Sequence, residues 1–342
     1  MNEVFPFPAL AGQEELKLAL LLALVNPAVG GVLLQGPYGV GKTTAVRSLI
    51  DLMPPAPQPI CVHGCSEDDP DAQCSDCKER VARGEPLTRE EPVRLIELPL
   101  NARMEDVVGG IDERVALEQR RVLLEPGVLF AAHRNILYVD EINLLEHTIA
   151  DAILDAAAQG RTFVRRGAMV RLFPSNFVLI GSMNPEEGRL RPQIMDRFGL
   201  RVWVHPLHRS DRLEAVRSGR AFRANPTAFR TLHTPRIMTL ATLVARAREA
   251  LPAVVASDEI EEAAVALVEA LHIPSHRAEA VLLEAARAHA ALAARQVTET
   301  NDLRSVAALA LRQRRSPALE NEVTRVVAED TAIAEAVRDL RI

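Results

Sequence analysis

Hydrophobic and polar positions follow two different patterns along the chain. Up to His205-Pro206, short apolar runs alternate with segments that have helical periodicity, which indicates a parallel sheet covered by helices. The runs that we expect to form strands are Val32–Leu34, Val93–Leu98, Ile136–Val139, Phe177–Ile180 and Arg201–Val204.

From about Ser210 the pattern is helical, with Ala/Leu-rich segments that carry charged faces. We expect helices over Leu240–Ala250, Asp258–Leu271, Arg277–Ala294 and Asn301–Arg312. The chain is therefore predicted to hold an α/β domain at 1–206, a linker at 207–235 and an all-α lid domain at 236–342.

Three shorter segments complete this outline. Alternation on both sides of Gly167, in Thr162–Arg166 and Ala168–Phe173, predicts a β-hairpin. The Pro-rich start of segment 54–92 predicts an insertion that leaves the sheet. The apolar run Leu18–Val25 is much shorter than the roughly 20 residues that a membrane span needs, so we interpret it as a buried helix.

Composition and charge narrow the functional classes. Hydrophobic residues make up 48% of the 342 positions but aromatic residues only 4%, so the core must be largely aliphatic. The net charge of −6 argues against a nucleic-acid partner, although the arginine-dense stretch 189–223 leaves a nucleic-acid remodeller as an alternative to an intersubunit face. The N-terminus lacks a basic leader, and we expect a cytoplasmic protein without a membrane span.

A phosphate-binding loop carries the strongest chemical signal. Residues 36–43 fit G-x-x-x-x-G-K-T, between a predicted strand and a helix-compatible stretch that begins at Thr44. Backbone N–H groups of such a loop surround phosphates, the lysine contacts the terminal phosphates and the threonine hydroxyl binds Mg²⁺. The predicted nucleotide-binding residues are Gly36, Pro37, Tyr38, Gly39, Val40, Gly41, Lys42, Thr43 and Thr44.

Two acids follow the strand Ile136–Val139, as in a Walker B motif. We expect Asp140, together with Thr43, to hold the Mg²⁺ of MgATP, and Glu141 to orient or deprotonate the attacking water. A strand that ends in Asp-Glu is weak evidence for a Walker B motif alone. The phosphate loop upstream makes this interpretation specific.

Three further polar residues complete the predicted site. Asn184 follows the strand Phe177–Ile180, where an amide can bind the attacking water or the γ-phosphate (sensor 1); the alternative is a turn asparagine before Pro185. Arg197 ends a predicted helix, where ring-forming ATPases present an arginine finger to the neighbouring subunit; alternatively it pairs with Asp196 or Glu187 on the surface. Arg277 begins a lid helix and is the candidate for a second sensor that reaches the phosphates.

All four cysteines lie close together in the predicted insertion. Cys61, Cys65, Cys74 and Cys77 could complete a tetrahedral Zn²⁺ site, with His63 as a substitute ligand. Free or redox-regulated thiols and a disulfide remain open as alternatives.

Together these motifs resemble the AAA+ ATPases, and within them the ATPase (I) subunit of magnesium chelatase. The resemblance covers most of the chain and is densest from Phe5 to Leu200. Its longest segments are Leu124-Glu125-Pro126-Gly127, Tyr138 to Leu145, Asn184-Pro185-Glu186-Glu187-Gly188, Leu190-Arg191-Pro192-Gln193 and Asp196-Arg197-Phe198-Gly199.

The resemblance implies an AAA+ core with a C-terminal helical lid, and an ATPase that drives Mg²⁺ insertion into protoporphyrin IX in chlorophyll or bacteriochlorophyll biosynthesis. It implies a ring, expected to be a hexamer, a partner with an integrin-like (von Willebrand A) domain and a large porphyrin-binding subunit. It also assigns the finger to Arg197 and the second sensor to Arg277. Pro37-Tyr38 departs from the family pattern, and Pro37 is typical of MoxR-like ATPases that remodel metalloproteins with von Willebrand A-domain partners, which is the alternative function.

Overall fold

The computed structural model describes residues 3–67, 70, 73–111, 117–118, 124–167 and 169–315. Its centre is a parallel five-stranded sheet in the order β11-β1-β10-β7-β4. The strands are β1 (Val32–Gln35), β4 (Leu95–Glu97), β7 (Ile136–Val139), β10 (Val178–Met183) and β11 (Leu200–Trp203). All of their carboxyl ends therefore meet at one edge of the sheet, where ligands bind in open α/β folds.

The two faces of the sheet pack on different helices because side chains alternate along a strand. Val32 and Leu34 of β1 belong to a core shared with α1 (Glu14–Val25), whereas Leu33 belongs to a core shared with α7 (His147–Gln159). From Leu18 onward helix α1 is entirely apolar, and it lies between the sheet and the helices of the C-terminal region, which explains the burial of this part.

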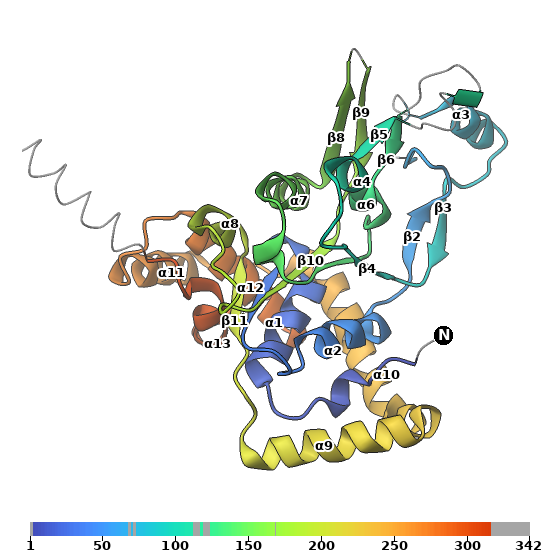
Figure 1. Ribbon diagram of the computed structural model, residues 1–342. Helices are drawn as coiled ribbons and strands as arrows, with labels where there is room; N and C mark the ends of the chain where they lie inside the picture. The colour runs from blue at the N-terminus through green and yellow to red at the C-terminus, as the bar shows by residue number, and fades with distance from the viewer. Residues whose placement is uncertain are drawn as a thin grey trace, which may run out of the picture.

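The C-terminal region packs against the outer side of α1 (Figure 1). Ala285 and Ala286 of α12 have no exposed surface and lie in the same core as α1. The helices of this region are α10 (Pro226–Ala250), α11 (Asp258–Ala270), α12 (Arg277–Leu292) and α13 (Thr300–Leu311).

Smaller elements surround the sheet. The hairpin β8 (Arg161–Arg166) and β9 (Met169–Pro174) projects from the body of the molecule, and the insertion stands beside it (Figure 1). Two further antiparallel ribbons are β2 (Ala56–Pro59) with β3 (Thr88–Glu91) and β5 (Gly109–Ile111) with β6 (Leu124–Pro126). The short helices are α2 (Lys42–Arg47), α3 (Ser75–Ala82), α4 (Met104–Val108), α6 (Val128–Ala131) and α8 (Pro192–Arg197), with 3₁₀ turns at Phe7–Ala9, Pro27–Val29, Ser48–Leu52, Ile142–Leu144 and Leu251–Ala253.

The predicted α/β class with a helical C-terminal region is confirmed, and so are the five strands and the hairpin, with ends shifted at most positions. Ala168 of the hairpin and residues 316–342 of the predicted lid lie outside the described residues. The segment 207–235, expected to be a linker, contains α9 (Arg209–Ala224) and the start of α10, in agreement with the helical pattern from about Ser210.

A helix cap and aromatic contacts stabilise this segment. Asn225 begins α10 because its side-chain oxygen accepts the Ala228 N–H at 2.9 Å, and Pro226 suits the first helical position. Phe222 and Phe229 both contact the ring of Phe5, with ring centroids 5.3 and 5.6 Å apart.

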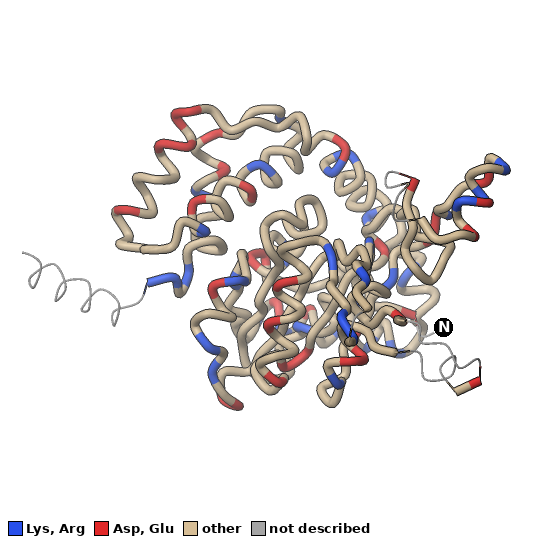
Figure 2. Tube along the Cα trace, turned by 90° about the horizontal axis from the view of Figure 1, so that it is seen from above, with Lys and Arg blue, Asp and Glu red and all other residues tan. Residues whose placement is uncertain are grey.

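Acidic and basic residues are interspersed along much of the described chain (Figure 2). Helix α9, within the arginine-dense stretch, carries more arginines than acids and has no buried residue. Among the helices that the structure describes, no candidate has the length and apolar character that crossing a membrane requires.

Candidate active site

The phosphate-binding loop connects β1 to α2 at the carboxyl edge of the sheet. Gly39 and Gly41 have φ of 73° and 92°, in the left-handed region that glycine tolerates best. A Cβ built on either would meet no atom within 4 Å, so the loop backbone faces open space. The Lys42 ammonium lies over the loop and donates to the carbonyl oxygens of Gly36 at 2.6 Å and Pro37 at 3.0 Å.

The loop forms one wall of a pocket of about 260 Å³. The opposite wall comes from the ends of β7 and β10, because parallel neighbours bring their carboxyl ends together. The residues that line this phosphate pocket are Tyr38, Gly39, Val40, Gly41, Lys42, Thr43, Thr44, Asp140, Glu141, Ser182, Met183 and Asn184. The structure thus brings the predicted Asp140, Glu141 and Asn184 to the predicted phosphate loop.

Two residues outside the predicted set organise the cation-binding side of the pocket. The Tyr138 hydroxyl donates to Asp140 Oδ1 at 2.9 Å and lies 3.2 Å from the Thr43 hydroxyl. Ser182 also donates to Asp140 Oδ1, and its hydroxyl accepts the Glu141 N–H at 3.3 Å. Tyr138 therefore links the two predicted Mg²⁺ ligands, and only its position two residues before Asp140 could have indicated this.

Burial and neighbouring charges shift the acid–base properties of the pocket. Loss of water lowers the pKa of Lys42, although Asp140, Glu141 and Glu187 act in the opposite direction. Desolvation raises the pKa of Glu141, and the negative charges of Glu187 and Asp140 add to this. A raised pKa makes a carboxylate a better proton acceptor, which suits a general base.

Asn184 is almost fully buried at the floor of the pocket. Its side-chain oxygen accepts the Glu186 N–H at 3.2 Å, so it does form a turn, as its alternative interpretation expects. Its side-chain nitrogen, however, is buried and has no hydrogen-bond partner among the described residues. An unpaired buried donor is costly, and it fits a site that a phosphate or a water fills.

An apolar pocket of about 430 Å³ adjoins the phosphate pocket and shares Gly39, Val40, Gly41 and Thr44 with it. Its other walls come from the N-terminal segment, which includes Phe5 and Leu10, from Leu207 and from Phe222 of α9. The two pockets together offer an apolar space for a nucleotide base next to a polar space for phosphates. MgATP fits the groups present: the open loop for the phosphates, the Thr43 and Asp140 oxygens for Mg²⁺, and the unpaired Asn184 amide.

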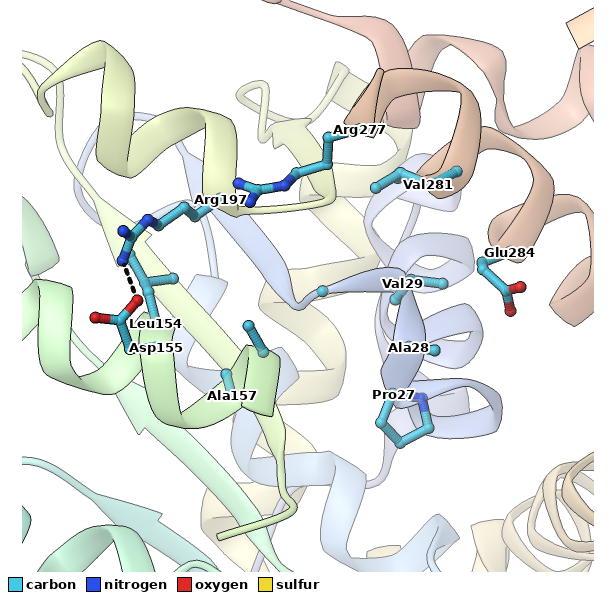
Figure 3. A pocket seen from close by; sticks show the side chains of 13 residues that line it. Pro27, Ala28, Val29, Leu154, Asp155, Ala157, Arg197, Arg277, Val281 and Glu284 are labelled. Atoms are coloured by element: carbon cyan, nitrogen blue, oxygen red, sulfur yellow. Dashed lines mark hydrogen bonds and ion pairs between the residues drawn. The ribbon is translucent and has the colours of Figure 1, made fainter. Parts of the chain in front are cut away.

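Arg197 and Arg277 line a separate pocket of about 370 Å³ (Figure 3). Arg197 donates to an Asp155 carboxylate oxygen at 2.7 Å and lies 3.7 Å from that of Asp151, so its partners are on α7 and are neither Asp196 nor Glu187. The sequence analysis predicts that Arg277 reaches the phosphates from the lid domain as a second sensor. Here it lines the pocket of Arg197 and not the phosphate pocket, and its helix α12 packs on α1 and on the turn Pro27–Val29.

Asp196 fixes the C-terminal region to α8, a contact that the sequence did not predict. Its carboxylate accepts hydrogen bonds from Arg314 at 2.7 Å and Ser275 at 3.2 Å, and its backbone carbonyl accepts one from Arg277 at 3.3 Å. The Asp-Arg-Phe motif therefore joins the lid through its aspartate while its arginine faces a pocket.

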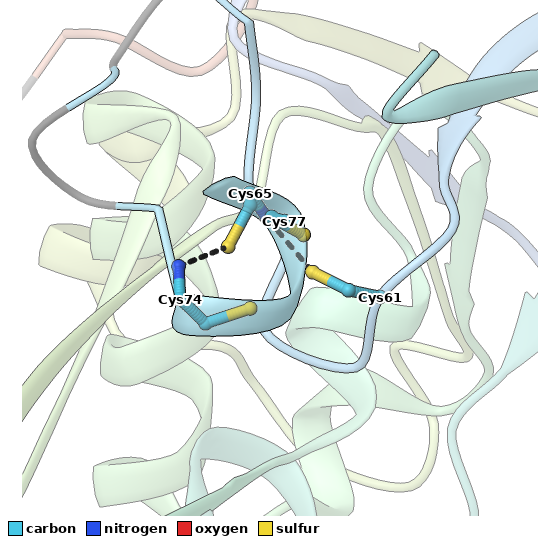
Figure 4. Close-up of side chains that lie close together, drawn as sticks. All are labelled: Cys61, Cys65, Cys74 and Cys77. Carbon is cyan, nitrogen blue, oxygen red and sulfur yellow. Dashed lines mark hydrogen bonds between the residues drawn. The ribbon is translucent and has the colours of Figure 1, made fainter. Parts of the chain in front are cut away.

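The four cysteines form a compact group in the insertion. The sulfur atoms of Cys61, Cys65, Cys74 and Cys77 all lie within 4.8 Å of one another, and all four are thiols rather than disulfides (Figure 4). This group lines neither the phosphate pocket nor the Arg197 pocket.

Comparisons with known proteins place these features in a family. Residues 113–197 match the family described as magnesium chelatase, subunit ChlI, and residues 261–335 match the AAA lid domain. The chain is 41% identical over 322 residues to a magnesium-chelatase subunit ChlI homolog of Methanocaldococcus jannaschii, covering 93% of this chain and 87% of that protein. It is also 41% identical to the magnesium-chelatase 38 kDa subunit of Rhodobacter capsulatus, covering 92% and 89% of the two chains.

Solved structures agree. A chain from a cryo-EM reconstruction of the complex between subunits BchI and BchD of magnesium chelatase matches with a TM-score of 0.52 and 38% identity, covering 94% of this chain and 99% of that one. A putative ATPase from Cytophaga hutchinsonii, 19% identical with a TM-score of 0.59, shares the fold. The chain belongs to the magnesium-chelatase subunit I (ChlI/BchI) family of AAA+ ATPases.

Proposed function

We propose that this chain is the ATP-hydrolysing motor of a magnesium-chelatase-type complex, in which it drives insertion of Mg²⁺ into protoporphyrin IX on a separate large subunit. The observation that carries the proposal is the convergence of Lys42, Thr43, Asp140, Glu141 and Asn184 on one pocket in a chain of this family. The Mg²⁺ inserted into the porphyrin is a substrate, distinct from the Mg²⁺ that accompanies ATP.

Within one subunit, each group of the phosphate pocket has a role. The loop backbone and Lys42 would hold the phosphates, and Thr43 and Asp140, linked through Tyr138, would hold the Mg²⁺ that neutralises their charge. Glu141 takes a proton from the attacking water, and the unpaired Asn184 amide positions that water or the terminal phosphate. The apolar pocket beside the loop receives the base.

The Arg197 pocket completes the site between subunits of a ring. Arg197 and Arg277 lie apart from the phosphate pocket of their own chain, so both act on the nucleotide of a neighbour, Arg197 as the finger and Arg277 as the second sensor. A hexamer is the ring size we propose.

Two further subunits complete the complex. The BchI chain that this protein resembles was reconstructed in a complex with subunit BchD. We assign to this chain a partner of that kind with a von Willebrand A domain that relays the conformational change, and a large subunit that binds the porphyrin. A Zn²⁺ ion at the four cysteines would support the structure and take no part in hydrolysis.

Fluorescence of magnesium protoporphyrin tests the proposal. The purified chain is combined with ATP, Mg²⁺, protoporphyrin IX and the two partner subunits of the same organism, with Lys42→Ala as the control. The proposal expects an ATP-dependent signal that the variant lacks. ATPase activity without any porphyrin signal would instead favour the MoxR-like function.

A further inference from the structure

The cysteine group lies in an insertion that has very little apolar core of its own. Among the described residues of segment 54–92, the buried side chains are Gln58, Cys65, Cys77 and Leu87. The stem of the insertion is a ribbon of two four-residue strands, β2 and β3. Segments with so small a core are normally stabilised by a disulfide or a metal ion.

The geometry of the sulfur atoms favours a single metal ion over disulfides. All four lie within 4.8 Å of one another, so each sulfur is near the other three rather than paired with one. A tetrahedral Zn²⁺ site with Zn–S bonds of about 2.3 Å has sulfur–sulfur edges of roughly 3.8 Å, which this group reaches with small movements. A disulfide requires a pair of sulfurs at about 2.05 Å and leaves no reason for four to converge.

The local backbone is folded around the sulfur atoms. The Cys65 N–H points at the Cys61 sulfur and the Cys74 N–H at the Cys65 sulfur, each at 3.3 Å. Cys74 immediately precedes α3 and Cys77 lies in its first turn, so the C-x₂-C pair faces the Cys61–Cys65 loop from one side (Figure 4). N–H groups directed at sulfur are the usual surroundings of metal thiolates, because they stabilise the negative charge.

We propose that Cys61, Cys65, Cys74 and Cys77 bind one structural Zn²⁺ ion that folds the insertion. Tetrahedral coordination by four thiolates is a property of Zn²⁺ and of iron–sulfur sites, and Zn²⁺ binds such sites more tightly than Fe²⁺. His63 is not a ligand: it lies outside the group of ligand atoms that converge.

The ion also supports the base of the β8–β9 hairpin. Gly64, between the first two cysteines, has φ of 68°, and a Cβ there would lie 2.5 Å from the Phe130 ring and 2.8 Å from Pro174. Pro174 is the last residue of β9, and the Phe130 ring packs on Phe173 with centroids 5.7 Å apart. The Cys61–Cys65 loop therefore presses on the hairpin base, and loss of the ion loosens this contact.

Metal analysis of the full-length protein, purified without chelators, tests the proposal. We expect about one zinc per chain, and less than about 0.1 in Cys74→Ser. His63→Ala and Lys42→Ala are matched controls that should keep about one zinc, since neither residue belongs to the group. Binding of ATP by Cys74→Ser shows that the rest of the chain is folded.

A second measurement covers the case in which the metal is lost during purification. Protein stripped with a chelator is titrated with Co²⁺, and the proposal expects the thiolate charge-transfer and d–d bands of a tetrahedral sulfur site, which Zn²⁺ then removes. Failure of the wild type to bind either metal, a mass that reveals disulfides, or zinc retained by Cys74→Ser would overturn the proposal. None of these readings needs the porphyrin or the partner subunits, so failure of the proposed chelatase function leaves them unaffected.

Discussion

Arg197 of α8 and Arg277 of α12 line the same pocket, and each is held by an aspartate: Arg197 by Asp155 at 2.7 Å, and Arg277 by the backbone carbonyl of Asp196 at 3.3 Å. The pocket also contains the carboxylates of Asp155 and Glu284, so its two guanidinium groups lie among anions of their own chain. Under the proposed function, Arg197 would exchange its ion pair with Asp155 for the phosphates of a neighbouring subunit's nucleotide.

The first prediction concerns the finger. Arg197→Ala should bind ATP with near-normal affinity, because Arg197 does not line the phosphate pocket, but should lose hydrolysis by about 10³-fold or more. When the variant is titrated into the wild type, ATPase activity should fall more steeply than dilution alone predicts.

Arg191→Ala is the matched control for this variant, since Arg191 is an exposed arginine at the start of the same helix. It should hydrolyse ATP normally. The reverse pattern, with Arg197→Ala active and Arg191→Ala inactive, would transfer the finger to Arg191.

A second prediction concerns the phosphate loop. Lys42→Ala should abolish nucleotide binding measured by calorimetry, because it removes the ammonium held over the loop by the Gly36 and Pro37 carbonyls. Lys17→Ala, which removes a lysine paired with Glu14 on α1, should bind ATP as the wild type does. Wild-type affinity in Lys42→Ala would contradict the assignment of the loop.

The pH dependence of hydrolysis provides a third prediction. Because desolvation, Glu187 and Asp140 raise the pKa of Glu141, the base becomes protonated at a higher pH than an ordinary glutamate, and kcat should fall on the acidic side from that pH downward. Glu187→Gln removes one negative charge, lowers the pKa of Glu141 and should move this acidic limb to lower pH. A limb that stays in place would exclude Glu141 as the titrating group.

Much of the core and of the phosphate pocket could be predicted because their signals are local. Strands of a parallel sheet are largely apolar, as in Ile136–Val139, and Asp140 and Asn184 directly follow strands β7 and β10. The sequence analysis missed strand β2 because it contains Pro57 and Pro59. Proline has no N–H to donate and is therefore confined to edge strands, and both strands of a two-stranded ribbon are edges.

Features that depend on distant packing could not be predicted in this way. The position of Arg277 follows from α12 packing on α1, and no spacing along the chain reveals which face of the core a lid helix covers. The role of Tyr138 depends on Ser182 in the neighbouring strand, so it emerges only when the two strands pair.

The fourth prediction concerns stability of the C-terminal region. Asp302 is fully buried and accepts hydrogen bonds from Arg295 at 2.7 Å and from His289. Asp302→Asn removes the buried carboxylate that binds Arg295 and leaves it only the exposed Glu299 at 3.5 Å, so it should destabilise the protein by about 2–4 kcal/mol, measured by urea unfolding. Asp258→Asn, at an exposed first-turn position of α11, should change stability by less than about 1 kcal/mol.

The same residue sets a pH window. Burial alone raises the pKa of Asp302, but the hydrogen bonds from Arg295, His289 and the Glu299 amide outweigh it, so its pKa lies below the usual range. Its contribution is therefore complete above the ordinary aspartate value, about pH 4, and is lost as the pH falls through the lower folded value. Asp302→Asn should lack this part of the acid sensitivity.

Helix α10 is a long helix with a proline inside it. Its 25 residues span about 37 Å at 1.5 Å per residue. Near its start Arg230 binds Asp51, and near its end Arg248 binds the Leu24 carbonyl. Pro235 between these anchors cannot donate a helical hydrogen bond, so the helix lacks one backbone bond in its first half. A bend of α10 therefore costs least at Pro235, between its contacts with Asp51 and with the Leu24 carbonyl.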